Sequence, residues 1–404
     1  MKLLLIALCL SMFPMATMSE PCRVQVTDAE NGWPVPLVEL RTTHDLRFVS
    51  DNAGLIAIDD PTLMHRETWF TIIGHGYGVA KDGFGYRGIR LTPTPGGTIE
   101  LPLKRSSIAK RIGRITGHGL FAESAKLGDT VDWQGAGGFG RDSVQVARYR
   151  DTLYWIWGDT RVGHYPLGVF HMTGAISGFA PFDLKPPLRP QLEHLRTPQN
   201  RPLAVARMPG DGPTWLTGLV ALPDATGKSH LVAVYRKIKP PLETVEGGFC
   251  EWNDAHMRFE PLRSLWRKSD GDKPIALADA HAALTTDADG KRWLYLGNPL
   301  PHARVPATYE AWQDLRQWQL LTPQRRVKSI DGNAIEPHSG SIAWNAYRKR
   351  WVSVFMQKFG KPSAFGTLWY AEADAPIGPW GPAIEILSHE NYTFYNPRLH
   401  PEQT

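Results

Sequence analysis

The sequence predicts an all-β protein, with a small N-terminal antiparallel sandwich followed by a five-bladed β-propeller whose last blade is cut short. The 404 residues include 38 Gly and 33 Pro, which divide the chain into short segments and leave little room for long helices. Apolar and polar residues alternate from residue 22 to about 105. Beyond residue 135, a strand, a turn and a second strand rich in Trp or Tyr recur at roughly 60 to 75 residues.

Residues 1–19 have the features of a secretory signal peptide. Lys2 supplies the positive end, an apolar run covers residues 3–13, and small residues follow before Glu20. We therefore expect a secreted or periplasmic protein. No other apolar run approaches membrane-spanning length, so no membrane span is expected. Export permits a disulfide between Cys22 and Cys250, but two unrelated thiols are the favoured interpretation.

Residues 20–105 are predicted to form the sandwich. The strands include "CRVQVTD", "ETWFTIIGHGYG" and "GTIELPLKR", with turns at Asn-Ala-Gly and Pro-Gly-Gly. The order of these features resembles carboxypeptidase-regulatory-like domains, which have a transthyretin-like fold. That resemblance implies a non-catalytic accessory module. Residues 106–134 are expected to be a linker with a strand near residues 115–121.

Residues 135–404 are predicted to form the propeller. Its four hairpins are "DSVQVARYRDTLYWIWGDT", "TWLTGLVALPDATGKSHLVAVYRK", "AHAALTTDADGKRWLYLGN" and "HSGSIAWNAYRKRWVSVFMQK". A fifth opening follows at "FYNPRLHPE", close to the last residue given. The strand near residue 115 is expected to complete this fifth blade. A four-bladed propeller with a C-terminal tail is the alternative.

Polar residues gather at one end of these predicted strands. The first strand of a blade lines the central channel and the second runs back beside it. The start of one strand and the end of the next therefore meet at the same mouth, about 4.8 Å apart. The residues placed there by this rule are Asp142, Asp159, Trp215, Arg236, Glu246, His281, Glu336, His338, Asn396 and His400.

Composition and motifs narrow the function classes. The net charge of +5 is spread over the sequence without a basic stripe, so we do not expect nucleic-acid binding. The sequence contains no phosphate-binding Gly-x-x-x-x-Gly-Lys-Ser/Thr loop and no Gly-x-Ser-x-Gly elbow. No cofactor is expected to be required. A divalent metal held by His281, His338 and His400 is a weakly supported alternative. A monomer is expected.

Several late segments resemble five-bladed propeller glycosidases of families 43 and 32. They are "LYWIWGDT", "SGSIAWNAYRKRWVSVF" and "LWYAEADAPIGPWGPAIEI", and the resemblance covers residues 135–400. It implies a secreted glycoside hydrolase acting on a polysaccharide or oligosaccharide with two carboxyl groups. By this resemblance Asp142 would be the base or nucleophile, Glu246 or Glu336 the acid, and Asp159 a charge modulator. Asp142 is followed by Ser143, where the family has Pro.

The remaining predicted mouth residues are assigned to substrate binding: Trp215, Arg236, His281, His338, Asn396 and His400. Two further functions stay open. In a polysaccharide lyase, Arg236, Lys237 and Lys358 would neutralise a uronate while a histidine removes a proton. A non-catalytic propeller would bind a glycan or a protein at the same mouth.

Overall fold

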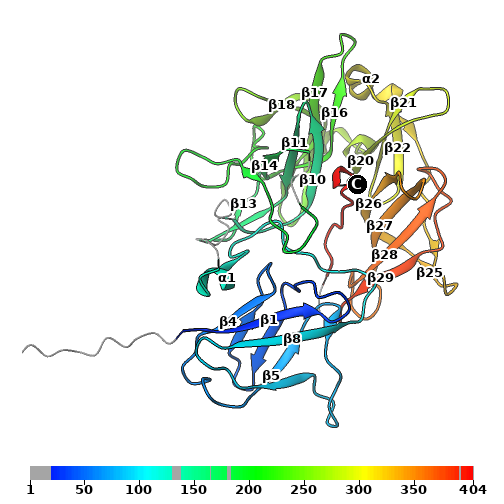
Figure 1. Cartoon of the computed structure of the whole chain (residues 1–404). Helices are drawn as coiled ribbons and strands as arrows, with labels where there is room; N and C mark the ends of the chain where they lie inside the picture. Colours follow the sequence, from blue (N-terminus) through cyan, green and yellow to red (C-terminus); the bar gives the residue numbers. More distant parts are fainter. Residues whose placement is uncertain (1–19, 130–137, 164, 180–182, 391–392, 404) are drawn as a thin grey trace, which may run out of the picture.

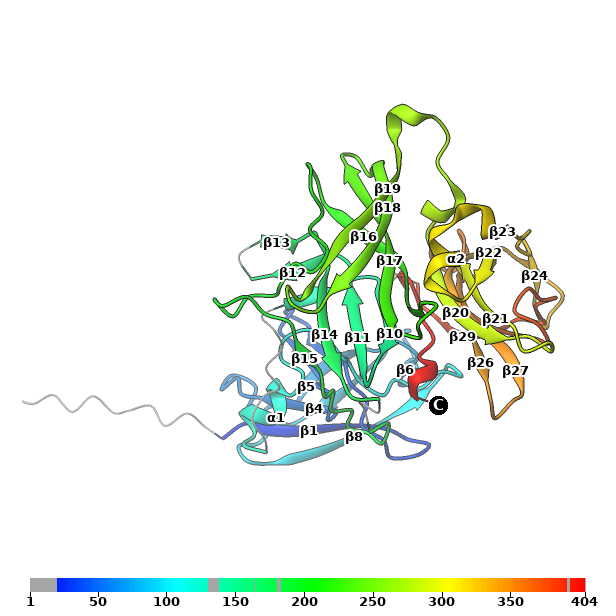
Figure 2. The ribbon, with the colours of Figure 1, turned by 90° about the horizontal axis from the view of Figure 1, so that it is seen from above.

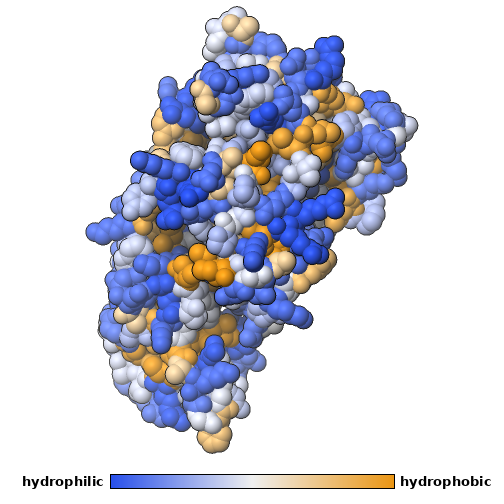
Figure 3. Space-filling model, turned by 90° about the vertical axis from the view of Figure 1, so that its right-hand side faces the viewer, coloured by the Kyte–Doolittle hydropathy of each residue, from blue (hydrophilic) through white to orange (hydrophobic). Residues whose placement is uncertain are grey.

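The computed structural model describes residues 20–129, 138–163, 165–179, 183–390 and 393–403. Figure 1 shows a β-sandwich at one end of the molecule and larger sheets arranged around a centre at the other. The outline is elongated, and on the face in Figure 3 hydrophobic residues form separate clusters among hydrophilic ones. The predicted class, a small sandwich followed by propeller blades, is confirmed.

The sandwich consists of two four-stranded sheets. One has the order β4-β1-β8-β6 and the other β3-β2-β5-β7. In β1 every second residue is buried, as the alternation in "CRVQVTD" predicts. β1 and β8 pair in parallel, and the other pairs are antiparallel. The strands are β1 Cys22–Asp28, β2 Glu39–Thr42, β3 Arg47–Val49, β4 Leu55–Ile58, β5 Thr68–Ile73, β6 Tyr77–Gly78, β7 Gly88–Leu91 and β8 Thr98–Arg105.

The segment after the sandwich contains a short helix, α1 (Ala122–Lys126), and the strand predicted near residues 115–121 is absent. The side chain of Asn52 explains this difference. Its Oδ1 accepts from the Arg114 amide at 2.9 Å, and its Nδ2 donates to the carbonyls of Arg114 (2.9 Å) and Leu188 (3.0 Å). A sandwich side chain thus satisfies backbone groups that a strand would have paired.

Four four-stranded sheets form the blades, and each begins with a predicted hairpin. Blade 1 has β10 Val144–Tyr149, β11 Thr152–Trp157, β14 Thr173–Ser177 and β15 Glu193–His194. Blade 2 has β16 Thr214–Pro223, β17 Ser229–Lys239, β18 Glu243–Asn253 and β19 Arg258–Arg267. Blade 3 has β20 His281–Thr286, β21 Arg292–Gly297, β22 Pro301–Pro306 and β23 Gln319–Leu320. Blade 4 has β26 Pro337–Asn345, β27 Arg350–Gln357, β28 Thr367–Ala373 and β29 Ile384–Ser388.

Smaller elements decorate the blades. A three-stranded sheet of order β13-β12-β9 lies beside blade 1, and β24 and β25 form a hairpin before blade 4. Their bounds are β9 Gly138–Arg141, β12 Thr160–Val162, β13 Tyr165–Val169, β24 Val327–Lys328 and β25 Ala334–Ile335. The helix α2 covers Tyr309–Gln313, and the 3-10 turns cover Lys268–Asp270, Ile275–Leu277, Leu315–Gln317 and Pro401–Gln403.

The first strands of the blades line a common centre. β10 contacts β16, β16 contacts β20, and β20 contacts β26. The view from above in Figure 2 shows this succession of sheets. One apolar cluster joins blades 1 and 2 through Tyr154 and Trp252, the next joins blades 2 and 3 through Phe249 and Trp312, and a third lies on blade 4 around Phe355. Face-to-face packing of neighbouring sheets is the arrangement of a propeller.

The C-terminal segment lies between blades 4 and 1. The Arg398 guanidinium donates to the Val146 carbonyl of β10 at 3.0 Å, and the Leu399 amide donates to Ser341 Oγ of β26 at 2.7 Å. The predicted fifth opening thus occupies the position of a first strand, although its residues form no strand. The sandwich lies against the outside of this gap, where the Ala109 amide donates to the Ile386 carbonyl at 3.0 Å.

Cys22 and Cys250 are free and buried, which agrees with two unrelated thiols. Among the helices of the described residues, none has the length and apolar character needed to cross a membrane. The predicted signal peptide lies outside the described residues.

Candidate functional site

Asp142 and Asp159 lie opposite each other at the ends of β10 and β11. The register pairs Val144 with Trp157, and its continuation brings the two acids together. The Asp142 amide donates to the Asp159 carbonyl at 3.2 Å. Side chains directly opposite each other on paired strands have Cβ atoms about 4.5–5.5 Å apart. The prediction that these two carboxylates share one mouth of the channel therefore agrees with the backbone geometry.

Burial shifts the ionisation of both acids. Burial, and after it the neighbouring charge of Asp159, raises the pKa of Asp142 to about 6, while a hydrogen bond with the Asp159 backbone works in the opposite direction. Burial also raises the pKa of Asp159, while a hydrogen bond from Trp215 works in the opposite direction. Two carboxyl groups in one partly buried site resist simultaneous ionisation, so the pair retains a proton more readily than free Asp does.

Glycine permits this arrangement at Gly158. A Cβ added there would lie 2.0 Å from Asp142 Oδ1, because the carboxyl group folds back over this residue. Ser143, next to Asp142, has a φ of 35°, a region that residues with side chains seldom occupy. The chain therefore bends between Asp142 and β10, and the bend places the carboxyl group over Gly158.

Blade 2 adds an aromatic ring and a cation. Trp215 Nε1 donates to Asp159 Oδ1 at 3.0 Å, so the first strand of blade 2 fixes a carboxylate of blade 1. Arg236 lies opposite Trp215 on β17. Its guanidinium forms an ion pair with Asp279, the second residue before β20. The site thus continues from blade 1 through blade 2 to the opening of blade 3.

Asp279 is a site residue that the sequence reasoning missed. Partial burial raises the pKa of Tyr395, and the charges of Asp142 and Asp279 raise it further. Both carboxylates therefore lie near this phenol, at the start of the C-terminal segment. The useful signal was an acid directly before a predicted first strand, as with Asp142. At blade 3 the predicted site residue is His281, two positions after Asp279.

The C-terminal segment is tied to the mouth by a chain of hydrogen bonds. Asn396 Nδ2 donates to Ser143 Oγ at 2.6 Å, and Ser339 Oγ donates to Asn396 Oδ1. Asn298, at the end of β21, accepts from the Gly340 amide at 3.0 Å. The predicted residue Asn396 therefore joins blade 4 to blade 1.

His281 and His400 lie deeper, in the channel. Burial, and after it the nearby charges of Arg398 and His400, lowers the pKa of His281 to about 3. The ring of His400 stacks on Trp155 with centroids 5.3 Å apart. Arg398 and Glu402 form an ion pair at 2.7 Å beside them. These contacts pack the C-terminal segment against the strands of blade 1.

Glu336 and His338 lie at the opening of blade 4. Glu336 is exposed and binds Lys358 at 2.8 Å, while His338 packs against Phe365 with ring centroids 4.5 Å apart. Glu336 lines a cleft of about 540 Å³ between blades 3 and 4. Asn298, His302 and Arg326 are among the other residues that line this cleft. Asn298 accepts from the Gly340 amide of blade 4, so one wall of the cleft belongs to the hydrogen-bonded chain that holds Asn396.

Glu246 occupies a different setting from the one expected of an acid catalyst. Tyr235 donates to its Oε1 at 3.2 Å, and Arg267 lies 3.7 Å from its Oε2. Both partners belong to its own blade, so these contacts anchor Glu246 within blade 2. Within the described ranges, no group of three or more His, Cys, Asp or Glu residues is arranged to hold a metal ion.

No protein-family model matches this sequence, and no curated protein is significantly similar to it in sequence. Among solved structures, an exo-beta-1,3-galactanase from Phanerochaete chrysosporium is 13% identical with a TM-score of 0.36, over 68% of this chain and 53% of that one. This chain thus spans about half the length of the galactanase.

Two further structures are similar to the same degree. An exo-1,5-alpha-L-arabinanase from a bovine ruminal metagenomic library is 13% identical over 64% of this chain and 83% of that one, with a TM-score of 0.36. A GH43_1 enzyme from Xanthomonas citri, complexed with xylotriose, is 14% identical over 61% and 73%, with a TM-score of 0.35. At these identities and TM-scores the similarity assigns no activity to this chain.

Proposed function

We propose that this protein is a glycoside hydrolase whose reaction takes place at the channel mouth, between Asp142 and Asp279. The observation that carries the proposal is the pKa of Asp142, raised to about 6 by burial and by Asp159. Across the same mouth the guanidinium of Arg236 pairs with the Asp279 carboxylate. A carboxyl group whose pKa is raised, facing a second carboxyl group that is paired with a cation, is an arrangement suited to glycoside hydrolysis.

The two acids would take different parts of the reaction. Asp142 would donate its proton to the glycosidic oxygen as the bond from that oxygen to the anomeric carbon breaks. Asp279 would accept a proton from the water whose oxygen forms the new bond to that carbon. This assignment reverses the role that the sequence suggested for Asp142 and replaces Glu246 and Glu336 with Asp279. The cleft along Glu336 and Asn298 would hold the sugar units on one side of the bond.

The three cations that a lyase would use to neutralise a uronate are bound to other groups of the protein. Lys237 is buried and its ammonium donates to the carbonyls of Met208, Gly210 and Gly212 at 2.8–3.2 Å. Arg236 is bound to Asp279 and Lys358 to Glu336. No group among these three remains to neutralise a uronate. Export also belongs to the proposal, on the signal-peptide features of residues 1–19.

Asp142→Asn and Asp279→Asn test the proposal on aryl pentosides and hexosides with good (dinitrophenyl) and poor (methylphenyl) leaving groups. A good leaving group needs no proton donor. Asp142→Asn is therefore expected to lose about 1,000-fold on poor leaving groups and far less on good ones. Asp279→Asn should lose activity on both. Asp331→Asn, an exposed acid outside the site, serves as the matched control.

Equal losses for Asp142→Asn on both series would remove Asp142 from the donor role. No product from any aryl glycoside or polysaccharide, over long incubation of the wild-type protein, would refute the hydrolase. The binding function would then take its place.

A further inference from the structure

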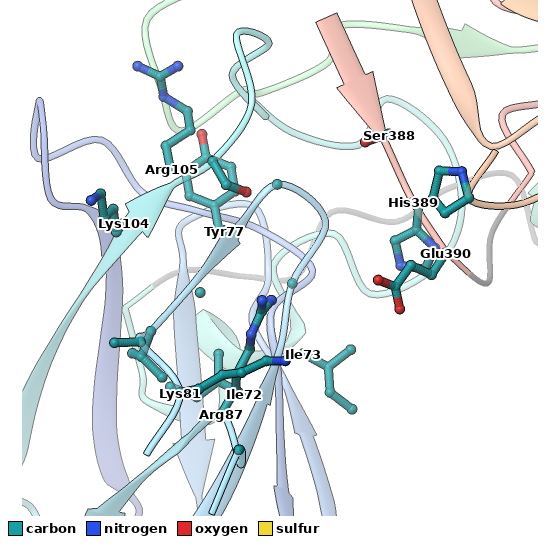
Figure 4. A pocket seen from close by; sticks show the side chains of 18 residues that line it. Ile72, Ile73, Tyr77, Lys81, Arg87, Lys104, Arg105, Ser388, His389 and Glu390 are labelled. Atoms are coloured by element: carbon teal, nitrogen blue, oxygen red, sulfur yellow. The ribbon is translucent and has the colours of Figure 1, made fainter. Parts of the chain in front are cut away.

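A second cleft lies where the sandwich meets blade 4, away from the channel mouth. Its volume is about 770 Å³. One side of the cleft belongs to the sandwich and is formed by β5, β6, β8 and the loop before β7 (Figure 4). The other side is formed by residues 388–390, at the end of β29. Nothing in the proposed hydrolysis uses this cleft.

Two contacts fix the separation of its two walls. The rings of His75 and His389 lie with centroids 4.1 Å apart. The Ala109 amide donates to the Ile386 carbonyl. Because these contacts hold the walls in place, a ligand would meet a cleft that already exists, and ordering it would cost little.

The lining of the cleft is rich in uncompensated positive charge. Lys81, Arg87 and Lys104 are exposed, and none of them forms an ion pair with another described residue. Arg105 is different, because Asp28 (3.1 Å) and Glu30 neutralise it. Glu390 is the one acid among the lining residues. Figure 4 shows the cations on the sandwich side and Glu390 on the opposite side.

The loop of residues 81–87 carries two of these cations, Lys81 and Arg87. The Asp82 carboxylate holds the loop, accepting from the amides of Phe84 and Tyr86 at 2.9 Å each. The rings of Phe84 and Tyr86 are exposed, and neither lines the cleft. The loop therefore contributes charge to the cleft, on a backbone that its own hydrogen bonds hold in place.

We propose that this cleft binds an anionic oligosaccharide, with Lys81, Arg87 and Lys104 contacting its carboxylate or sulfate groups. The cations come from two parts of the sandwich, the loop of residues 81–87 and β8, which suits charges repeated along a polymer better than one compact phosphate. The choice of a glycan rests on the proposed function, because a second binding site for the same polymer would strengthen the binding of a hydrolase to its substrate. The charge and the shape of the cleft do not depend on it.

The full-length protein is titrated calorimetrically with oligogalacturonate, with a heparin oligosaccharide and with a neutral cello-oligosaccharide of the same length. We expect at least about tenfold tighter binding of an anionic oligomer than of the neutral one, weakening as salt rises. Preference for oligogalacturonate identifies carboxylate as the ligand group, and preference for the heparin oligosaccharide identifies sulfate.

The variant Lys81→Gln/Arg87→Gln is expected to weaken anionic binding about tenfold. Its matched control, Arg201→Gln/Lys273→Gln, removes the same charge from exposed sites outside the cleft and should change binding less than twofold.

Equal affinity for neutral and anionic oligomers, or equal losses in the two double variants, would overturn the proposal. Competition by duplex DNA as strong as by the glycans would also overturn it, since that behaviour marks nonspecific charge attraction. Asp142→Asn is expected to keep full binding, and Lys81→Gln/Arg87→Gln to keep full turnover of small aryl glycosides. Loss of the binding result therefore counts against the second site alone, and loss of the turnover result counts against the hydrolase alone.

Discussion

Asp142 and Asp159 are joined across β10 and β11 by a backbone hydrogen bond of 3.2 Å, so that two acids share one partly buried end of a hairpin. Hairpin register brings the two backbones together, and burial then makes the second negative charge unfavourable.

Asp142→Asn is expected to change how stability depends on pH. In the unfolded chain Asp142 loses its proton near pH 3.8, but in the folded protein near pH 6. Between these values the folded state binds more protons, so the free energy of unfolding falls as pH rises. The variant should gain on the order of 1–3 kcal/mol over the wild type above pH 6, and nothing below pH 4. Urea titrations across pH measure this, with Asp331→Asn expected to show no such difference.

Gly158→Ala is expected to displace the Asp142 carboxyl group, which lies 2.0 Å from the position of the new Cβ. The moving atoms end a side chain, so stability should fall by only about 1–2 kcal/mol. Activity should fall about 100-fold, because small displacements of a reacting group are costly. Gly140→Ala, which has open space around its Cβ, is the control. Full activity in Gly158→Ala would show that the carboxyl position is unimportant.

Trp215→Phe removes the N–H group that donates to Asp159 Oδ1 at 3.0 Å. The pKa of Asp159 should rise, because this bond favours its charged form. A less charged Asp159 raises the pKa of Asp142 less, so the upper limb of the pH–activity profile should move to lower pH. Trp344→Phe, on the exposed end of β26, should leave the profile unchanged. An unchanged profile in Trp215→Phe would disconnect Trp215 from the acid pair.

Asn396→Ala and Asn396→Gly test the closure of the ring by the C-terminal segment. Both remove the hydrogen bonds to Ser143 and Ser339 and should lower the free energy of unfolding by about 1–3 kcal/mol. The φ of Asn396 is 49°, which glycine accepts without strain. The Ala variant should therefore be less stable than the Gly variant by roughly 1 kcal/mol. Thermal and urea unfolding of both measure the difference, and equal stabilities would argue against this backbone conformation.

Lys237→Met leaves three loop carbonyls without their donor. The ammonium is buried and bonded to Met208, Gly210 and Gly212, so its removal should cost about 2–4 kcal/mol. Lys239→Met, at the exposed end of the same strand, should cost little. Chemical denaturation compares them. A stable Lys237→Met variant that loses activity would instead favour a role in substrate binding.

Local sequence determined the sandwich strands and the four hairpins, because alternation and turn residues act over a few positions. It also determined the Asp142–Asp159 pair, since both acids flank one hairpin whose register fixes their meeting. The strand predicted near residue 115 does not form. The side chain of Asn52 hydrogen-bonds to the backbone amide and carbonyl of Arg114, 62 positions away in the sequence. The residues next to position 115 in the sequence give no sign of this contact with Asn52.

Only the tertiary structure decided which distant residues complete the site. Arg236 reaches Asp279 across 43 positions, and Trp215 reaches Asp159 across 56. Neither pair has a local signature, because the packing of blade against blade sets which side chains meet. Burial decided their chemistry in the same way. Exclusion of water by the assembled blades, together with the charge of Asp159, raises the pKa of Asp142 to about 6.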